Sequence, residues 1–160
     1  VLGGARSGKS SCAERLATEC GEPVLYVATA TAGDDEMRER IERHRTQRPA
    51  SWRTQETPTS LQPQVSGIHT VLVEDLTLLL SNLMGEDASS AEARAQAEVQ
   101  ALTQLHVNVV LVSNEVGMGL VPPYHLGRVF RDSLGRLNQS AASLVDEAYF
   151  VVAGVPLRLK

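Results

Sequence analysis

The first ten residues of the chain hold the pattern that is most clearly suited to chemistry. The stretch GGARSGKS, residues 3–10, fits the phosphate-binding motif G-x-x-x-x-G-K-S/T. Its glycines allow backbone N–H groups to turn towards phosphate oxygens at the start of a helix. In such a motif Lys9 reaches the β- and γ-phosphates, and the Ser10 hydroxyl ligates Mg²⁺. The motif therefore predicts nucleotide binding, but it does not say what happens to the nucleotide.

An acidic residue at the end of a neighbouring strand is the second requirement of such a site, because the Mg²⁺ needs a carboxylate partner. Two strand ends supply candidates: TVLVED ends in Glu74 and Asp75, and VVLVSNE ends in Glu115. Each of these carboxylates could instead cap the helix or turn that follows its strand. The sequence leaves both interpretations open and favours Glu74 slightly for the metal or nucleotide role.

One histidine, His44, stands on the arginine-rich segment DDEMRERIERHRTQRPASW. At 100° per residue Met37, Ile41 and His44 lie within about 60° of one another, so the histidine falls on the inward stripe of a helix. It could be a half-buried core histidine. It could also be a nucleophile or general base, because neutral imidazole attacks phosphorus and the neighbouring arginines could hold phosphates. Periodicity does not decide between the two.

Short β-branched apolar runs alternate with helical patterns, and these elements must position the residues above. The runs predict strands over 24–28, 70–73, 107–113 and 148–152, with Val1-Leu2 as the tail of another strand. Helices are expected over 9–20, 34–48, 75–84, 90–105 and 125–145, and loops over 54–69, 85–90 and 121–124. The alternation predicts an α/β fold around a mostly parallel sheet, in one domain over residues 1–160.

The last helical segment carries an apolar stripe on one side and polar residues on the other. The polar side includes Arg128, Arg131, Asp132 and Asn138. This side is either a solvated face with an Arg128–Asp132 ion pair or a second surface for an anion or substrate. Both interpretations stay open.

Composition excludes some classes of protein. The chain has 15 Lys and Arg against 19 Asp and Glu, a net charge of −4, so we expect no nucleic-acid partner held mainly by phosphate contacts. No apolar run approaches the length of a membrane span, and no signal peptide is visible. Cys12 and Cys20 are roughly 12 Å apart on one expected helix, too far to form a disulfide. We expect a cytoplasmic protein.

Several segments besides the phosphate-binding motif are distinctive: HRTQRPASWRT at 44–54, SNEVGMGLVP at 113–122 and GRVFRDSLGRLNQ at 127–139. Together they resemble, over essentially the whole chain, the bifunctional adenosylcobinamide kinase / adenosylcobinamide-phosphate guanylyltransferase family of cobalamin biosynthesis. The patterns H-R-x-x-R-P-x-x-W-R-T and N-E-V-G-x-G-x-V-P are much more specific than a P-loop. The resemblance implies a three-layer, RecA-like P-loop NTPase fold and a homo-oligomer, a trimer or dimer of trimers, with sites between subunits.

The resemblance also implies two reactions. A nucleoside triphosphate, ATP or GTP, phosphorylates the hydroxyl on the aminopropanol arm of adenosylcobinamide. GTP then transfers GMP to a histidine, which by the resemblance is His44, and adenosylcobinamide phosphate takes up the GMP to give adenosylcobinamide-GDP. Lys9 and the expected Mg²⁺ ligands Ser10 and Glu74 complete the site. The residues expected to bind nucleotide are Gly3, Gly4, Ala5, Arg6, Ser7, Gly8, Lys9, Ser10, Ala28, Thr29, Ala30, Arg45, Thr46, Gln47, Arg48, Glu56 and Glu74.

The sequence departs from the family pattern in three places. The usual D-C-L-T is Glu74-Asp75-Leu76-Thr77 here, so the acid that serves the metal stays open. The stretch 85–90 is shorter than usual. The leading strand is nearly missing, which suggests either truncation or a numbering that starts late. Two other functions also stay open: a small-molecule P-loop kinase with a structural histidine and no guanylyl step, and a RecA-like nucleotide-sensing module that acts through a partner.

Overall fold

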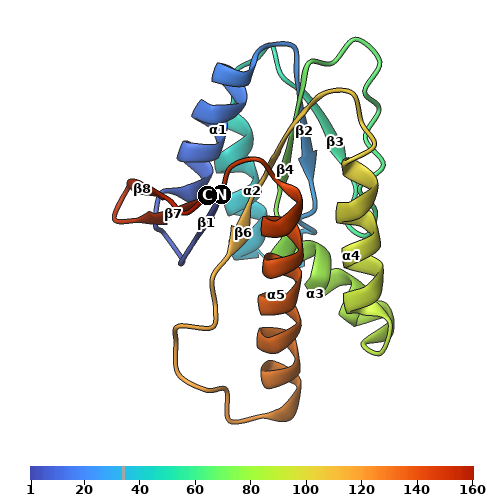
Figure 1. Cartoon of the computed structure of the whole chain (residues 1–160), viewed down its shortest axis with the longest axis vertical. Helices are drawn as coiled ribbons and strands as arrows, with labels where there is room; N and C mark the ends of the chain where they lie inside the picture. The colour runs from blue at the N-terminus through green and yellow to red at the C-terminus, as the bar shows by residue number, and fades with distance from the viewer. Residues whose placement is uncertain (34) are drawn as a thin grey trace.

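Parallel strands and the helices that connect them form the frame of the molecule (Figure 1). The computed structural model describes residues 1–33 and 35–160, without the side chains of residues 36, 37, 40, 43, 44 and 47. The strands are β1 (Leu2–Gly3), β2 (Val24–Ala28), β3 (Arg53–Glu56), β4 (Thr70–Glu74), β5 (Asn108–Leu111), β6 (Ser113–Asn114), β7 (Tyr149–Val152) and β8 (Val155–Arg158). The helices are α1 (Lys9–Cys20), α2 (Asp35–Gln47), α3 (Leu76–Asp87), α4 (Ala91–Leu102) and α5 (His125–Leu144).

The strands lie in the orders β3-β2-β4-β5 and β6-β1-β7-β8. Only Val112 separates β5 from β6, and it links the two groups of strands. The Val112 N–H donates to the carbonyl oxygen of Val73 at 3.0 Å, and the Ser113 N–H donates to that of Val1 at 3.0 Å. The chain therefore pairs with β4 before this residue and with β1 after it. Every pairing between described strands is parallel except that of β7 with β8, which confirms the α/β fold with a mostly parallel sheet.

Side chains alternate between the two faces of this sheet and define three layers. On one face Tyr26 and Leu72 pack with Ala13 of α1. On the other face Val27 packs in a larger core with Leu79 and other residues of α3, α4 and α5. Figure 1 shows α1 on one side of the strands and α3, α4 and α5 on the other. This arrangement leaves the carboxyl ends of β1, β2, β4 and β6 together at one edge.

Several of the expected boundaries were wrong. The strand expected over 107–113 is interrupted at Val112, where the pairing changes partner. The loop expected over 54–69 begins within β3, a mostly exposed polar strand that is held by its pairing with β2 rather than by an apolar pattern. The break expected from residue 85 comes later, because α3 continues to Asp87, whose carboxylate accepts hydrogen bonds from the serines that follow. The hairpin strand β8 was not predicted.

Helix α5 corrects two expectations about its polar side. The Arg128–Asp132 pair was wrong: Asp132 pairs with Arg131 at 2.9 Å, while Arg128 donates to the carbonyl oxygens of residues 122 and 123 at 3.0 and 2.9 Å. Asn138 was expected on the polar outer face, yet it is buried. Arg128 therefore holds the loop before α5 in place. Neither α5 nor any other helix of the described residues combines the length and apolar character needed to cross a bilayer.

Candidate active site

The segment 3–10 forms a tight loop between β1 and α1. Gly8 precedes α1 with a φ of 91°, and Arg6 also has a positive φ, 56°. The Ser7 N–H donates to the Gly4 carbonyl oxygen at 3.3 Å, and the Gly154 N–H donates to the Ser7 carbonyl oxygen at 2.8 Å. These bonds hold a loop at the N-terminus of α1, where unpaired backbone N–H groups and the helix dipole favour an anion.

The side chains of this loop also fit a phosphate. The Ser7 hydroxyl is buried and has no hydrogen-bond partner among the described atoms. Lys9 is only 5% exposed, and its Nζ lies 3.5 Å from the Gly4 carbonyl oxygen. Position 3 has room only for glycine, because a Cβ there would lie 2.8 Å from the Val151 carbonyl oxygen and would collide with the Ser7 hydroxyl. The loop thus offers a buried cation and an unused donor.

Glu74, at the end of β4, connects the phosphate loop to the rest of the site. The Ser10 hydroxyl donates to its Oε1, and the Tyr26 hydroxyl donates to its Oε2 at 3.1 Å. In the part of the chain that is described, no group of three His, Cys, Asp or Glu side chains could hold a metal. Mg²⁺ usually takes one or two protein oxygens and completes its shell with water and substrate phosphates. The hard-oxygen pair Ser10–Glu74 fits that mode of binding.

The two other candidate acids have local structural partners. Asp75 caps α3, because its Oδ1 accepts from the Leu78 N–H at 2.8 Å, and its Oδ2 accepts from the Asn114 side-chain amide at 3.2 Å. Glu115 accepts from the Gly117 N–H at 2.5 Å in the turn after β6. Of the three, Glu74 is the carboxylate that contacts the serine of the phosphate loop.

A pocket of about 320 Å³ opens beside Glu74 at the carboxyl edge of the sheet, bounded by β2, β3, β4 and α2. It brings together a group of the residues expected to bind nucleotide: Ala28, Ala30, Arg45, Arg48, Glu56 and Glu74. Thr29 does not line it. That side chain is fully buried, and its hydroxyl accepts from the Asp75 N–H at 2.7 Å and donates to the Asp75 carbonyl oxygen at 2.8 Å.

Helix α2 contributes one wall of the pocket through Arg38, Ile41, Glu42 and Arg45. The backbone of His44 and Gln47 belongs to this helix, but the side chains of both lie outside the described residues. Thr46 is exposed and does not line the pocket. The structure therefore places position 44 on a pocket-lining helix and does not test the role of the imidazole.

Arg48 follows α2 directly and is held by two neighbouring strands. Its guanidinium lies 3.4 Å from the centroid of the Tyr26 ring, and its Nη1 donates to the Thr54 hydroxyl on β3 at 3.2 Å. The Nε of Arg48 is buried and unpartnered among the described atoms. Sequence reasoning missed Tyr26 and Thr54. Tyr26 becomes recognisable only from the register, which pairs Ala28 with Glu74 and so puts the tyrosine beside the end of β4.

Charge is concentrated around Arg48. Burial raises the pKa of the Tyr26 hydroxyl, and the negative charge of Glu74 raises it further, against a smaller opposing effect of Arg48. The phenol therefore remains a protonated donor. Burial also raises the pKa of Glu14 on α1, again with Glu74 raising it and Arg48 lowering it. Arg48 thus partly opposes the effect of the Glu74 charge on the pKa of two groups on different elements, Tyr26 on β2 and Glu14 on α1.

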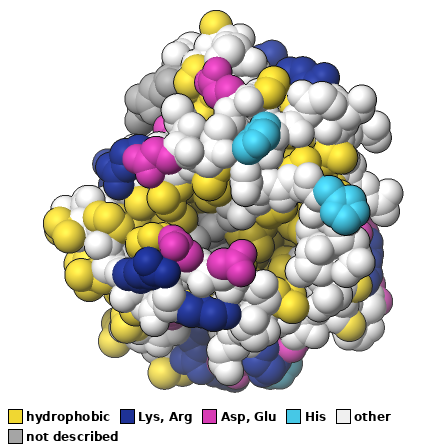
Figure 2. All heavy atoms as spheres, turned by 45° about the horizontal axis from the view of Figure 1, so that its top comes forward, with side chains coloured by type: hydrophobic (Ala, Val, Ile, Leu, Met, Phe, Trp, Pro, Cys, Tyr) yellow, Lys and Arg dark blue, Asp and Glu magenta, His cyan; other side chains and the backbone are white. Residues whose placement is uncertain are grey.

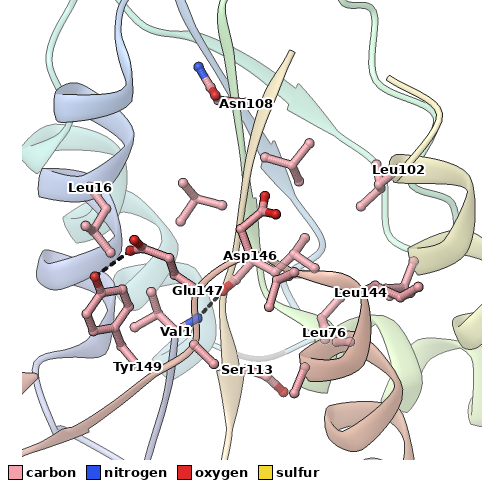
Figure 3. A pocket seen from close by; sticks show the side chains of 18 of the residues that line it. Val1, Leu16, Leu76, Leu102, Asn108, Ser113, Leu144, Asp146, Glu147 and Tyr149 are labelled. Carbon is pink, nitrogen blue, oxygen red and sulfur yellow. Dashed lines mark hydrogen bonds between the residues drawn. The ribbon is translucent and has the colours of Figure 1, made fainter. Parts of the chain in front are cut away.

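A second cavity, of about 460 Å³, lies at the opposite, amino end of the sheet. Figure 2 shows this face as a hollow with apolar side chains inside and acidic side chains at its rim. In Figure 3 Tyr149 donates its hydroxyl to Glu147 there, at 2.6 Å. Open α/β sheets bind their ligands at the carboxyl ends of the strands, so the pocket beside Glu74 is the candidate active site.

A phosphate loop joined through a serine–carboxylate pair to an arginine-lined pocket is typical of a P-loop protein that binds a nucleoside triphosphate. The family described as "Cobinamide kinase / cobinamide phosphate guanyltransferase" matches residues 1–159. The "bifunctional adenosylcobalamin biosynthesis protein CobP" of Pseudomonas aeruginosa is 45% identical over 165 residues, which cover 100% of this chain and 95% of that protein. The corresponding CobU proteins of Escherichia coli and Salmonella typhimurium are each 40% identical over 178 residues, covering 100% of this chain and 98% of theirs.

The chain belongs to the cobinamide kinase / cobinamide phosphate guanyltransferase family. It is a transferase with the kinase and guanyltransferase roles of that family, as the resemblance in the sequence led us to expect.

Proposed function

We propose that one domain over residues 1–160 carries both reactions at the site beside Glu74. It phosphorylates adenosylcobinamide and then converts the phosphate to adenosylcobinamide-GDP through a covalent histidine–GMP on His44. The observation that supports this most is the contact of Ser10 with Glu74, because it joins the phosphate loop to the pocket that Arg45 and Arg48 of the His44 segment line.

In the kinase step the backbone N–H groups of residues 3–8 and the Lys9 ammonium hold the β- and γ-phosphates of ATP or GTP. The substrate hydroxyl forms an O–P bond to the γ-phosphorus while the bond from that phosphorus to the β-phosphate oxygen breaks. The nucleoside diphosphate leaves, and the hydroxyl proton passes to solvent water. Ser10 and Glu74 would hold Mg²⁺, which neutralises charge on the phosphates when it is bound. The residues act mainly by placement and electrostatics.

In the guanylyl step an imidazole nitrogen of His44 forms a bond to the α-phosphorus of GTP, and pyrophosphate leaves. A phosphate oxygen of adenosylcobinamide phosphate then attacks the same phosphorus, the N–P bond breaks, and the histidine is regenerated. Arg45 and Arg48 line the pocket and would hold phosphate oxygens there, and Ala28, Ala30 and Glu56, which also line it, would contact the rest of the nucleotide.

Labelling with GTP tests the covalent step. The chain is incubated with GTP labelled at the α-phosphate and Mg²⁺, and the acid-labile protein-bound label is measured for wild type, His44→Ala and His106→Ala. His106 is an exposed histidine outside the pocket and serves as the matched control. We expect label on wild type and His106→Ala and none on His44→Ala. Label that survives in His44→Ala would transfer the role to another residue, and no label on wild type would leave a kinase without the guanylyl step.

A homo-oligomer, a trimer or a dimer of trimers, is part of the same proposal. The loop before α5 and the start of that helix expose large apolar side chains, which we call the apolar arm: Met118, Leu120, Val121, Tyr124 and Leu126. Leu120 is 97% exposed, and several large apolar side chains exposed on one segment are typical of a protein interface. Light scattering tests it: a mass equal to one chain at all micromolar concentrations would contradict an oligomer.

We also propose a cytoplasmic location. Cys12 is buried, Cys20 is exposed and neither forms a disulfide, which agrees with a reducing compartment. Recovery of the native protein in the membrane or secreted fraction of its cells would contradict this location.

A further inference from the structure

Tyr26 contacts two different parts of the site and has no role in the function proposed so far. It is 3% exposed, on the face of β2 that packs against α1. Its hydroxyl donates to Oε2 of Glu74 at 3.1 Å, and its ring lies under the Arg48 guanidinium. The hydroxyl and the ring can be removed separately by substitution.

The hydroxyl fixes the orientation of the Glu74 carboxylate. Ser10 occupies Oε1 and Tyr26 occupies Oε2, so both oxygens have a donor from a different element, α1 and β2. A carboxylate held at both oxygens keeps one rotamer and needs little reorganisation when a ligand arrives. Without the tyrosine hydroxyl, Ser10 at Oε1 would be the remaining donor to this carboxylate among the described side chains, and the carboxylate could rotate away from the phosphate loop.

The ring fixes the position of Arg48. The guanidinium lies 3.4 Å from the ring centroid and also donates to Thr54 on β3. Stacking and the hydrogen bond together restrict a long side chain that would otherwise have many rotamers. Because Arg48 comes directly after α2 (Asp35–Gln47), the ring also influences where the end of that helix lies.

We propose that Tyr26 is a positioning residue that holds Glu74 and Arg48 in a fixed arrangement relative to one another. Glu74 would then keep its place for Mg²⁺ and Arg48 its place at the end of α2. This inference rests on the proposed function, in which Ser10 and Glu74 bind Mg²⁺ together with a nucleotide. A buried tyrosine that served only to fill the core would affect stability, but not the dependence of nucleotide binding on metal.

Binding of GTP with Mg²⁺ and with a chelator, measured by calorimetry, tests the hydroxyl. Tyr26→Phe keeps the ring and removes the donor to Glu74. We expect it to weaken binding of Mg²⁺·GTP by about tenfold, the size of a hydrogen bond to a charged group, and to leave metal-free GTP binding unchanged. The matched control is Tyr149→Phe, which removes a comparable hydroxyl–carboxylate hydrogen bond at the amino end of the sheet (Figure 3) and should change neither affinity.

A second variant tests the ring. Tyr26→Leu removes both the hydroxyl and the surface beneath Arg48, so we expect a further loss of α-phosphate labelling from GTP beyond that of Tyr26→Phe. Tyr26→Phe should recover labelling when the Mg²⁺ concentration is raised, whereas Tyr26→Leu should not. Thermal unfolding of each variant gives the fraction folded under assay conditions, and the affinities are compared only for folded protein.

The outcomes separate this inference from the proposed function. If wild type binds GTP more tightly with Mg²⁺ and Tyr26→Phe keeps the full difference, the positioning role is overturned and the metal site stands. Equal weakening of metal-bound and metal-free GTP would show a structural role only, and would also overturn it. If wild type gains nothing from Mg²⁺, the proposed metal site fails and the inference fails with it.

Discussion

Helix α2 lines the pocket beside Glu74, whereas the phosphate loop is joined to that pocket through the contact of Ser10 with Glu74. The loop and the helix are held by different means. The loop is fixed by backbone hydrogen bonds, among them Ser7 to Gly4 and Gly154 to Ser7, and by the lack of space around Gly3. On α2 the described ion pairs stay within the helix: Arg38 with Asp35 at 2.5 Å and Arg45 with Glu42 at 3.7 Å.

This difference means that backbone packing determines the geometry of the phosphate loop, whereas side-chain contacts determine the geometry on the α2 side. The phosphate loop is continuous with β1 and α1, so its geometry depends on the same bonds that hold the core. Among the described side chains on the α2 side, Arg48 stacks on the buried Tyr26 ring and donates to the Thr54 hydroxyl. Changes on the loop side should therefore affect both reactions and stability, whereas changes on α2 should affect individual steps.

The largest effect is expected at Glu74, where the two sides meet. Glu74→Gln keeps a similar shape but removes the negative charge beside Ser10. We expect both the phosphorylation of adenosylcobinamide and the transfer of GMP to fall by about 100-fold or more, because both would depend on the same charge stabilisation of phosphate. Steady-state assays of each step at saturating nucleotide measure this.

Glu115→Gln is the control for that variant, because Glu115 accepts a hydrogen bond from Gly117 in its own turn and does not line the pocket. We expect it to keep both activities. If Glu74→Gln removed only one of the two reactions, the two steps would use different acids and a shared site beside Glu74 would be wrong.

The phosphate loop and most of the framework could be predicted from the sequence because their signals are local. Segment 3–10 is a contiguous motif, and α1 was expected over its observed residues 9–20. Strand β2 is a buried apolar run that begins directly after Pro23. It too was expected with its observed bounds. In these elements the structure is determined by residues that are close together in the sequence.

The contacts between strand ends could not be predicted, because they depend on which strands are neighbours. The hydrogen bond of Tyr26 to Glu74 requires the parallel pairing of β2 with β4, and the periodicity of neither segment contains that information. The same holds for Thr29, expected to bind nucleotide but used by the backbone of Asp75. A polar edge strand such as β3 has no apolar period at all.

An intermediate effect is expected from filling the phosphate loop. Gly3→Ala would place a Cβ 2.8 Å from the Val151 carbonyl oxygen, a backbone atom that cannot move away by changing rotamer. We expect the free energy of unfolding to fall by about 1–3 kcal/mol, as for other overpacked sites. Gly4→Ala, in the same loop, meets nothing within 4 Å and should change stability by no more than about 0.5 kcal/mol. Guanidinium unfolding of both variants tests the pair, and equal losses would mean that space at Gly3 is not what fixes the loop.

The smallest effect is expected on α2. Asp35→Asn removes the ion pair with Arg38, in which the two side chains are 94% and 63% exposed. Because solvent screens such a pair and the helix keeps its other contacts, we expect the free energy of unfolding to change by less than about 0.5 kcal/mol. Both reactions should continue, because Asp35 does not line the pocket. Guanidinium unfolding of Asp35→Asn and Gly3→Ala under the same conditions compares their free energies of unfolding. A loss in Asp35→Asn as large as that in Gly3→Ala would mean that α2 is fixed by the fold as firmly as the phosphate loop. The distinction between the loop and the helix would then be wrong.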